Sequence, residues 1–201
     1  MDNDLQVVKM VSAYVIELLS FHLPKEMVFH NLHHTEQVVV SVIEFSQDLN
    51  LSLNDRSVLQ TAAWFHDTGY CYGYTNHEDI SKAIAGTFLR QLHCKDEYIQ
   101  QVNDCISATR IPQKPHTLLQ EIICDADFFH FSRTTYQDDA GRLRTEWETF
   151  LKKSFSSQEW DKLNLDFLQS HSYFTSYGRD MLQERKERNI KDLGRKLAIK
   201  T

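Results

Sequence analysis

The stretch "AAWFHDTGY", residues 62–70, places a histidine and an aspartate side by side at the end of an apolar run. Burial of an imidazole and a carboxylate is unfavourable unless the two groups are paired or bind something else. Adjacent residues on a regular helix point in different directions. His66 and Asp67 can therefore meet only where the helix ends, and Thr68-Gly69 supplies such an ending. We expect a binding site at this doublet.

Three other stretches carry imidazole and carboxylate side chains near the ends of predicted helices. "FHNLHHTEQV" contains His30 and His34, "TNHED" contains His77, and "ICDADFFHF" contains Asp127. Imidazole nitrogen and carboxylate oxygen are the usual ligands of divalent transition metals, and a mixed set suits Mn²⁺, Fe²⁺, Ni²⁺, Co²⁺ or Zn²⁺. His30 and His34 are four residues apart and can share a helix face, so one could bind the metal while the other faces a substrate.

The rest of the chain has the periodicity of helices. Apolar residues recur every three or four positions from Leu5 to Leu19, and Pro24 closes that element. Only 6 glycines and 3 prolines occur in 201 residues, which favours long helices joined by short loops. A second helix is expected from near residue 31, and Asn54 or Asp55 could cap a third. Further helices are expected over about 78–92, 96–108, 116–130, 134–152, 158–170 and 178–198. The expected fold class is all-α, because no segment predicts a strand.

Composition and charge exclude several classes of protein. With 41% apolar and 25% charged residues, the chain is globular rather than disordered. The net charge is −6, although residues from 178 onward carry eight lysines and arginines against four acidic residues. Residues 1–177 therefore carry a larger net negative charge than the whole chain, which disfavours nucleic-acid binding. Scattered cysteines indicate reduced thiols. Together with the lack of a signal sequence or of an apolar run long enough to span a bilayer, they predict a cytoplasmic protein.

In order and context, these motifs resemble those of the HD-domain superfamily of metal-dependent phosphohydrolases, over about residues 28–130. The counterparts of the family's metal ligands are His34, the doublet His66-Asp67 and Asp127. The resemblance implies an all-α bundle around a divalent metal (Mn, Fe, Ni, Co, Zn or Mg) and hydrolysis of a phosphate ester, often of a nucleotide. "FHN-x-x-H" is also similar to cyclic-nucleotide phosphodiesterases, which implies that His30 is a general acid. Asp67 would also orient the attacking water, and His77 could donate the proton instead of His30.

Contacts to the substrate are predicted from position alone. Tyr70 could line a pocket that stacks a base, or it could pack within its loop. Arg110 and Lys114 lie in the proline-bearing loop "ATRIPQKPH", residues 108–116, and are the candidate cations for phosphate oxygens.

The chain also departs from parts of the family pattern. Members with two metals supply further histidines after the doublet. His77 could be one of these, but Thr109 stands where another is expected, so we expect one tightly held metal. "TGYCYGY" replaces the acidic pair of the guanosine-tetraphosphate hydrolases, which disfavours that substrate. Asp125 is expected to support the site or to cap a helix rather than to bind the metal.

We divide the chain into a phosphohydrolase domain, residues 1–177, and a charged C-terminal helix, residues 178–201. That helix could pack on the domain, pair with its copy in a homodimer, or link the domain to a partner. The expected activity is that of a cyclic-nucleotide phosphodiesterase or nucleotidase acting on a small phosphorylated substrate. One alternative is a metal-bound nucleotide sensor that relays its state through the C-terminal helix. The other is an oxygenase with a di-iron site.

Overall fold

The protein is all-α, as predicted, in a computed structural model that describes residues 2–199 and the side chains of residues 5–199. No strand occurs within this range. The α-helices are α1 (Asp2–His22), α2 (Leu32–Asp48), α3 (Leu53–Phe65), α4 (His77–Gln91), α5 (Asp96–Ala108), α6 (Leu118–Asp127), α7 (Tyr136–Phe150), α8 (Ser157–Ser170) and α9 (Gln183–Ile199). Short helical turns are η1 (Thr68–Cys71), η2 (Phe128–Ser132) and η3 (Gly178–Leu182).

The helix ends differ from the predictions in three places. Ser52, rather than Asn54 or Asp55, caps α3: its hydroxyl accepts a hydrogen bond from the backbone N–H of Asp55, which satisfies one of the unpaired donors of the first turn. The helix expected over 116–130 ends at Asp127 and continues as the 3₁₀ turn η2. The last predicted helix begins as a π-helical turn, η3, before α9.

A single apolar core holds α1 to α6 together. Helix α3 lies between α1, α2 and α5, and its Leu59 and Phe65 are fully buried. Val15 of α1, Phe45 of α2 and Ile106 of α5 pack into the same core. The core therefore fixes the end of α3, where the His66-Asp67 doublet lies, against the neighbouring helices.

The first helix corrects one expectation. Leu5–His22 of α1 is an 18-residue window with a mean hydropathy of 1.2, so it is long and apolar enough to cross a membrane by length and composition alone. The core helix of a soluble protein and an N-terminal signal sequence pass the same test, and 33% of this window is buried. Val7, Val11 and Val15 of this helix are buried, and α1 packs against α3.

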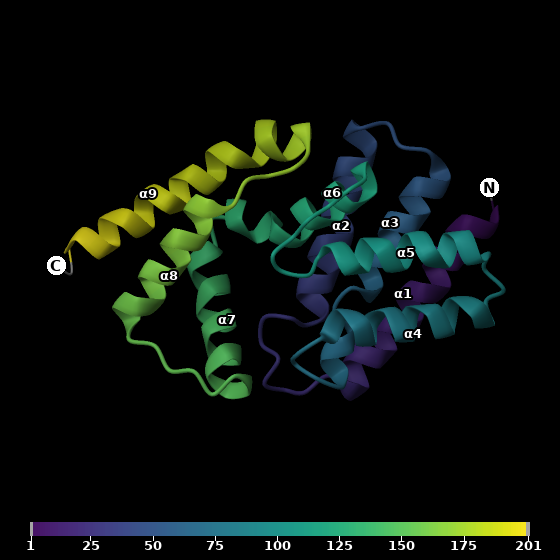
Figure 1. Ribbon diagram of the computed structural model, residues 1–201, viewed down its shortest axis with the longest axis horizontal. Coiled ribbons are helices and arrows are strands. Elements are labelled where there is room, and N and C mark those ends of the chain that lie inside the picture. The colour runs from purple at the N-terminus through teal and green to yellow at the C-terminus, as the bar shows by residue number, and fades with distance from the viewer. Residues whose placement is uncertain (1, 200–201) are drawn as a thin grey trace.

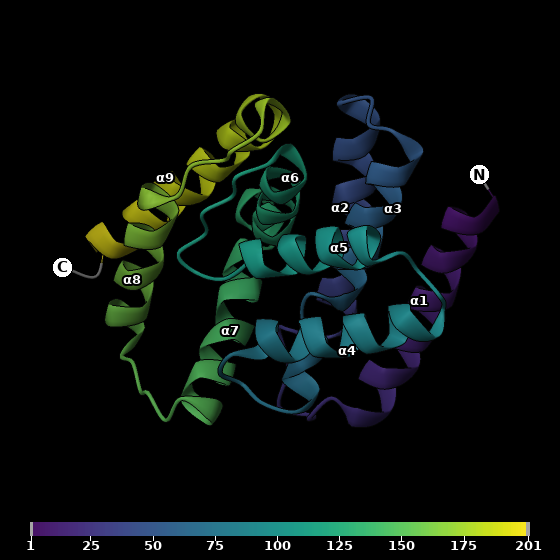
Figure 2. The ribbon, with the colours of Figure 1, turned by 45° about the vertical axis from the view of Figure 1, so that its right-hand side comes forward.

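A second, smaller cluster joins the C-terminal helices. Phe131, Tyr136, Leu168 and Leu193 are buried together and connect η2 with α7, α8 and α9. Both ribbon views place α7, α8 and α9 on one side of the molecule and α1, α3, α4 and α5 on the other (Figures 1 and 2). The charged C-terminal helix thus packs on its own chain. Homodimerisation through it stays a prediction.

Candidate metal centre

The doublet lies where the backbone leaves the helix. Helix α3 ends at Phe65, His66 is still helical, and Asp67 has φ −107° and ψ 3° at the start of η1. This change of direction lets the two side chains converge, with His66 Nε2 3.2 Å from Asp67 Oδ2. Both side chains are almost completely buried.

Gly69 allows a close approach between η1 and α4. A Cβ at this position would lie 2.0 Å from the carbonyl oxygen of His77, which is a backbone atom. The backbone N–H of Gly69 also donates a hydrogen bond to Ser81 Oγ of α4 (2.8 Å). Gly69 has no positive φ, so the glycine is not required by its own backbone conformation. Its function is to let α4 carry His77 next to Asp67.

Two more helices bring the other side chains to the doublet. The Asn31 side chain caps α2 by accepting hydrogen bonds from the backbone N–H groups of His33 and His34, which fixes the first turn of the helix. His34 Nε2 then lies 3.4 Å from Asp67 Oδ2 and 3.2 Å from Asp127 Oδ1 at the end of α6. Ligand atoms of His34, His66 and Asp127 lie within 4.8 Å of one another, a spacing suited to a metal ion.

The chemistry of this cluster fits a cation. His66 Nδ1 lies 2.8 Å from the Ala63 carbonyl oxygen, so Nδ1–H donates to it and Nε2 faces the cluster, where it would bind a metal ion in the deprotonated ring. Asp67 Oδ2 is buried without a hydrogen-bond partner. Burial lowers the pKa of His66, but Asp67 and Asp127 outweigh burial and raise this pKa well above its usual value. The two carboxylates thus favour positive charge at the centre of the cluster, which a divalent ion would supply.

His30 is held by a carboxylate that the sequence analysis missed. Glu146 of α7 is fully buried, and its Oε2 lies 2.6 Å from His30 Nδ1. Its other oxygen accepts hydrogen bonds from the backbone N–H groups of Phe29 (2.6 Å) and His30 (2.9 Å). Burial lowers the pKa of His30, but the hydrogen bond with Glu146 and the nearby carboxylate charges of Asp67, Glu146 and Asp127 together outweigh burial and raise this pKa. Glu146 fixes both the orientation and the charge of this imidazole.

Tyr70 lies between two histidines. Its ring stacks on His77 with centroids 3.9 Å apart and on His30 with centroids 4.5 Å apart. His77 Nε2 is 3.5 Å from Asp67 Oδ1, at the edge of the metal centre. The structure therefore brings His30, Tyr70 and His77 together beside the predicted ligands.

Other predicted residues lie apart from this group. The Arg110 guanidinium is 2.7 Å from Asp79 and 3.5 Å from Glu78, and neither Arg110 nor the exposed Lys114 lines the cavity next to the metal centre. Asp125 accepts hydrogen bonds from the backbone N–H groups of Phe174 and Thr175, so it anchors the segment before α9. This role agrees with the expectation that Asp125 supports the structure rather than binding metal.

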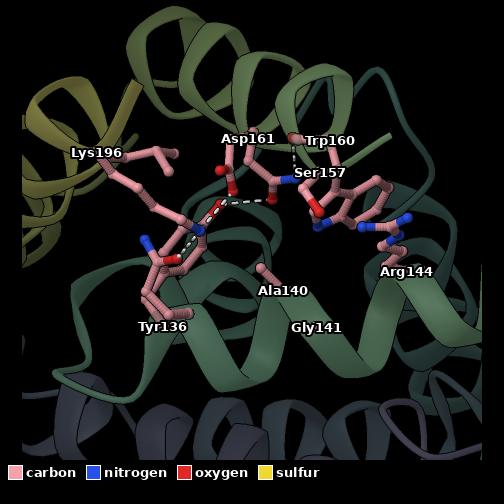
Figure 3. A pocket seen from close by; sticks show the side chains of 11 residues that line it. Tyr136, Ala140, Gly141, Arg144, Ser157, Trp160, Asp161 and Lys196 are labelled. Carbon is pink, nitrogen blue, oxygen red and sulfur yellow. Dashed lines mark hydrogen bonds and ion pairs between the residues drawn. The ribbon is translucent and has the colours of Figure 1, made fainter. Parts of the chain in front are cut away.

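A cavity of about 440 Å³ opens beside the cluster. Asp67, Asp127, His30 and His77 line its polar end, and aromatic and aliphatic side chains line the remainder. A smaller cavity of about 210 Å³ shares residues with it, including Trp160. Figure 3 shows side chains of α7 and α8 facing one another across this smaller cavity, with Lys196 of α9 bonded to Asp161.

Comparisons with known proteins identify the fold. No family model matches the chain, and no curated protein matches it. A structural match is the crystal structure of a predicted HD superfamily hydrolase from an uncultured Thermotogales bacterium. It superimposes with a TM-score of 0.64 over 96% of this chain and 92% of the other, at 17% sequence identity. At this identity the likeness shows a common fold, and this fold agrees with the one that the resemblance of the sequence motifs implied.

Proposed function

We propose that the protein is a metal-dependent phosphohydrolase that cleaves a phosphate ester of a nucleotide or another small molecule. The observation that carries the proposal is the convergence of His34, His66, Asp67 and Asp127 at one end of a cavity that also contains His30.

All four cysteines in the chain are free thiols, in keeping with the proposed cytoplasmic location.

Four side chains would hold the ion. His34, His66, Asp67 and Asp127 offer two imidazole nitrogens and two carboxylates, a donor set that accepts several transition metals. When bound, a divalent ion lowers the pKa of water and offsets the negative charge of a phosphoryl oxygen.

The remaining groups would handle the protons of the reaction. Asp67 Oδ2 has no hydrogen-bond partner in the protein, so it can accept one from the attacking water and orient it. The water oxygen bonds to phosphorus while the ester P–O bond breaks. His30 Nδ1 is bound to Glu146, which leaves Nε2 to protonate the departing alcohol oxygen. The carboxylates nearest to His77, those of Asp67 and Glu78, lie 3.5 and 3.8 Å from its Nε2, whereas Glu146 lies 2.6 Å from Nδ1 of His30 and leaves Nε2 free, so we assign the general acid to His30.

The test compares Asp67→Asn with the unmodified protein. We expect metal-dependent hydrolysis of phosphate esters in the unmodified protein and a loss of at least about 100-fold in the variant. Asp67 also pairs with His66 and His34, so the free energy of unfolding of the metal-free variant is measured alongside, and the loss of activity is assigned to the site only in a variant that remains folded. The matched control is His33→Ala, because His33 is exposed and adjacent to His34.

Two outcomes would contradict the proposal. Full metal-dependent turnover by Asp67→Asn would show that Asp67 takes no part in the reaction. Tight nucleotide binding without hydrolysis across many esters would favour a sensor instead.

A further inference from the structure

The cavity beside the metal centre continues into an apolar chamber. We use "aromatic chamber" for the part of the cavity formed by η2, α7 and α8, which is lined by Phe128, Phe131, Leu143, Trp147, Leu163 and Phe167. The full cavity, about 440 Å³, lies within the range of about 300–1,000 Å³ that is typical of ligand pockets. Most of the cavity wall is apolar, so the chamber provides a large part of the contact surface.

Away from the metal centre and His30, the cavity wall offers no cationic side chain within residues 5–199. Among residues 5–199, no lysine or arginine lines this cavity. Its acidic residues outside the metal centre are already paired, Asp139 with Arg142 and Glu78 with Arg110. A phosphate group away from the metal centre would therefore be desolvated without a cation to bind it, which is strongly unfavourable.

We propose that the substrate carries a single phosphoryl group, bound at the metal centre, and a large uncharged aromatic group that fills the aromatic chamber. This inference rests on the proposed phosphohydrolase function and narrows its substrate class. Nucleoside diphosphates and triphosphates are excluded as substrates, because their additional charges would face apolar side chains. A nucleoside monophosphate fits this substrate class only if its base occupies the aromatic chamber.

The experiment uses esters that differ only in the group expected to enter the chamber. Ethyl phosphate and phenethyl phosphate release primary alcohols of similar acidity, so a difference in kcat/KM reports binding of the phenyl group. Burial of that ring should raise kcat/KM by at least about tenfold. Adenosine triphosphate should be hydrolysed with a kcat/KM less than about a hundredth of that for phenethyl phosphate. Equal values for the two esters, or faster hydrolysis of the triphosphate, would overturn the inference.

Phe167→Ser locates the effect in the chamber. Phe167 is 38% exposed, so its replacement should leave the protein folded. We expect the ratio of kcat/KM for phenethyl phosphate to that for ethyl phosphate to fall at least about fivefold. Val40→Ser is the matched control, because Val40 is 54% exposed, lies on α2 and does not line the cavity. An unchanged ratio in Phe167→Ser, or an equal fall in Val40→Ser, would contradict the assignment of the chamber.

A binding measurement separates this inference from the proposed function. The phosphonate analogues of the two esters are not hydrolysed, so calorimetric titration measures their affinity for the metal-loaded protein without turnover. We expect phenethylphosphonate to bind at least about tenfold more tightly than ethylphosphonate. If no ester is hydrolysed but this preference holds, the phosphohydrolase proposal fails and the chamber assignment stands. If the two phosphonates bind equally, the chamber assignment fails whatever the turnover.

Discussion

His66 shows how one residue connects the backbone to the metal centre. Its Nδ1 donates a hydrogen bond to the carbonyl oxygen of Ala63, three residues earlier in the same chain segment. This bond fixes the orientation of the ring and turns Nε2 toward His34 and Asp67. Because the arrangement is local, a short sequence motif is sufficient to predict that the doublet binds something.

Glu146 could not be found in the same way. It lies 116 residues after His30, in the stretch "RTEWETF", where it looks like one of several surface charges. The available signal was its spacing: it follows Asp139 by seven residues, on the helix face that packs inward. An acidic residue on an apolar helix face requires a partner, but the sequence does not say which partner.

At the residue scale, we predict that Glu146→Gln slows the reaction through His30. Loss of the carboxylate charge should lower the pKa of His30. His30 must be protonated to donate its proton, so activity is lost as the pH rises through that pKa. The alkaline limb of the pH profile of kcat/KM should therefore move to lower pH, and kcat should fall about 10- to 100-fold with little change in KM.

Glu148→Gln is the control for this experiment. Glu148 lies on the same helix but is 38% exposed and paired with Arg144. An alkaline limb that stays in place in Glu146→Gln would mean that Glu146 only supports the fold.

At the scale of elements, the sequence predicts the helices better than the way in which they meet. The apolar period identifies each long helix, because one face of each packs into a core. It also indicates that α3 ends near Thr68-Gly69. The glycine is required by the close approach of the α4 backbone rather than by the conformation of Gly69 itself. Contacts of this kind depend on a segment whose position the sequence alone does not give.

Gly69→Ala tests this contact between η1 and α4. The added methyl group would collide with the carbonyl group of His77, so the two segments must move apart. We expect the free energy of unfolding, measured with urea, to fall by about 2–3 kcal/mol. Metal affinity should fall as well, because Asp67 adjoins η1.

Gly141→Ala provides the comparison. A Cβ at Gly141 of α7 would have no heavy atom within 4 Å, and alanine is the better helix former by about 0.5–1 kcal/mol. This variant should be slightly more stable than the unmodified protein. Equal stability of Gly69→Ala and the unmodified protein would show that η1 and α4 are not tightly held together.

At the scale of the whole molecule, the cavity joins two groups of helices. The metal centre comes from α2, α3, η1 and α6, whereas the aromatic chamber comes from η2, α7 and α8. In the sequence, the apolar residues of α7 and α8 resemble ordinary core positions, so the chamber could not be predicted. Arg110 and Lys114 were proposed from loop position alone, and the structure places the Arg110 guanidinium on Asp79.

The central claim is that His34, His66, Asp67 and Asp127 bind a divalent metal ion. The most direct test is the metal content of the purified protein, of His66→Ala and of His33→Ala, measured by mass spectrometry after reloading with transition metals. We predict one metal ion per chain in the unmodified protein and in His33→Ala, and loss of this ion in His66→Ala. An unmodified protein that retains no metal, or a His66→Ala variant that retains the full amount, would contradict the account.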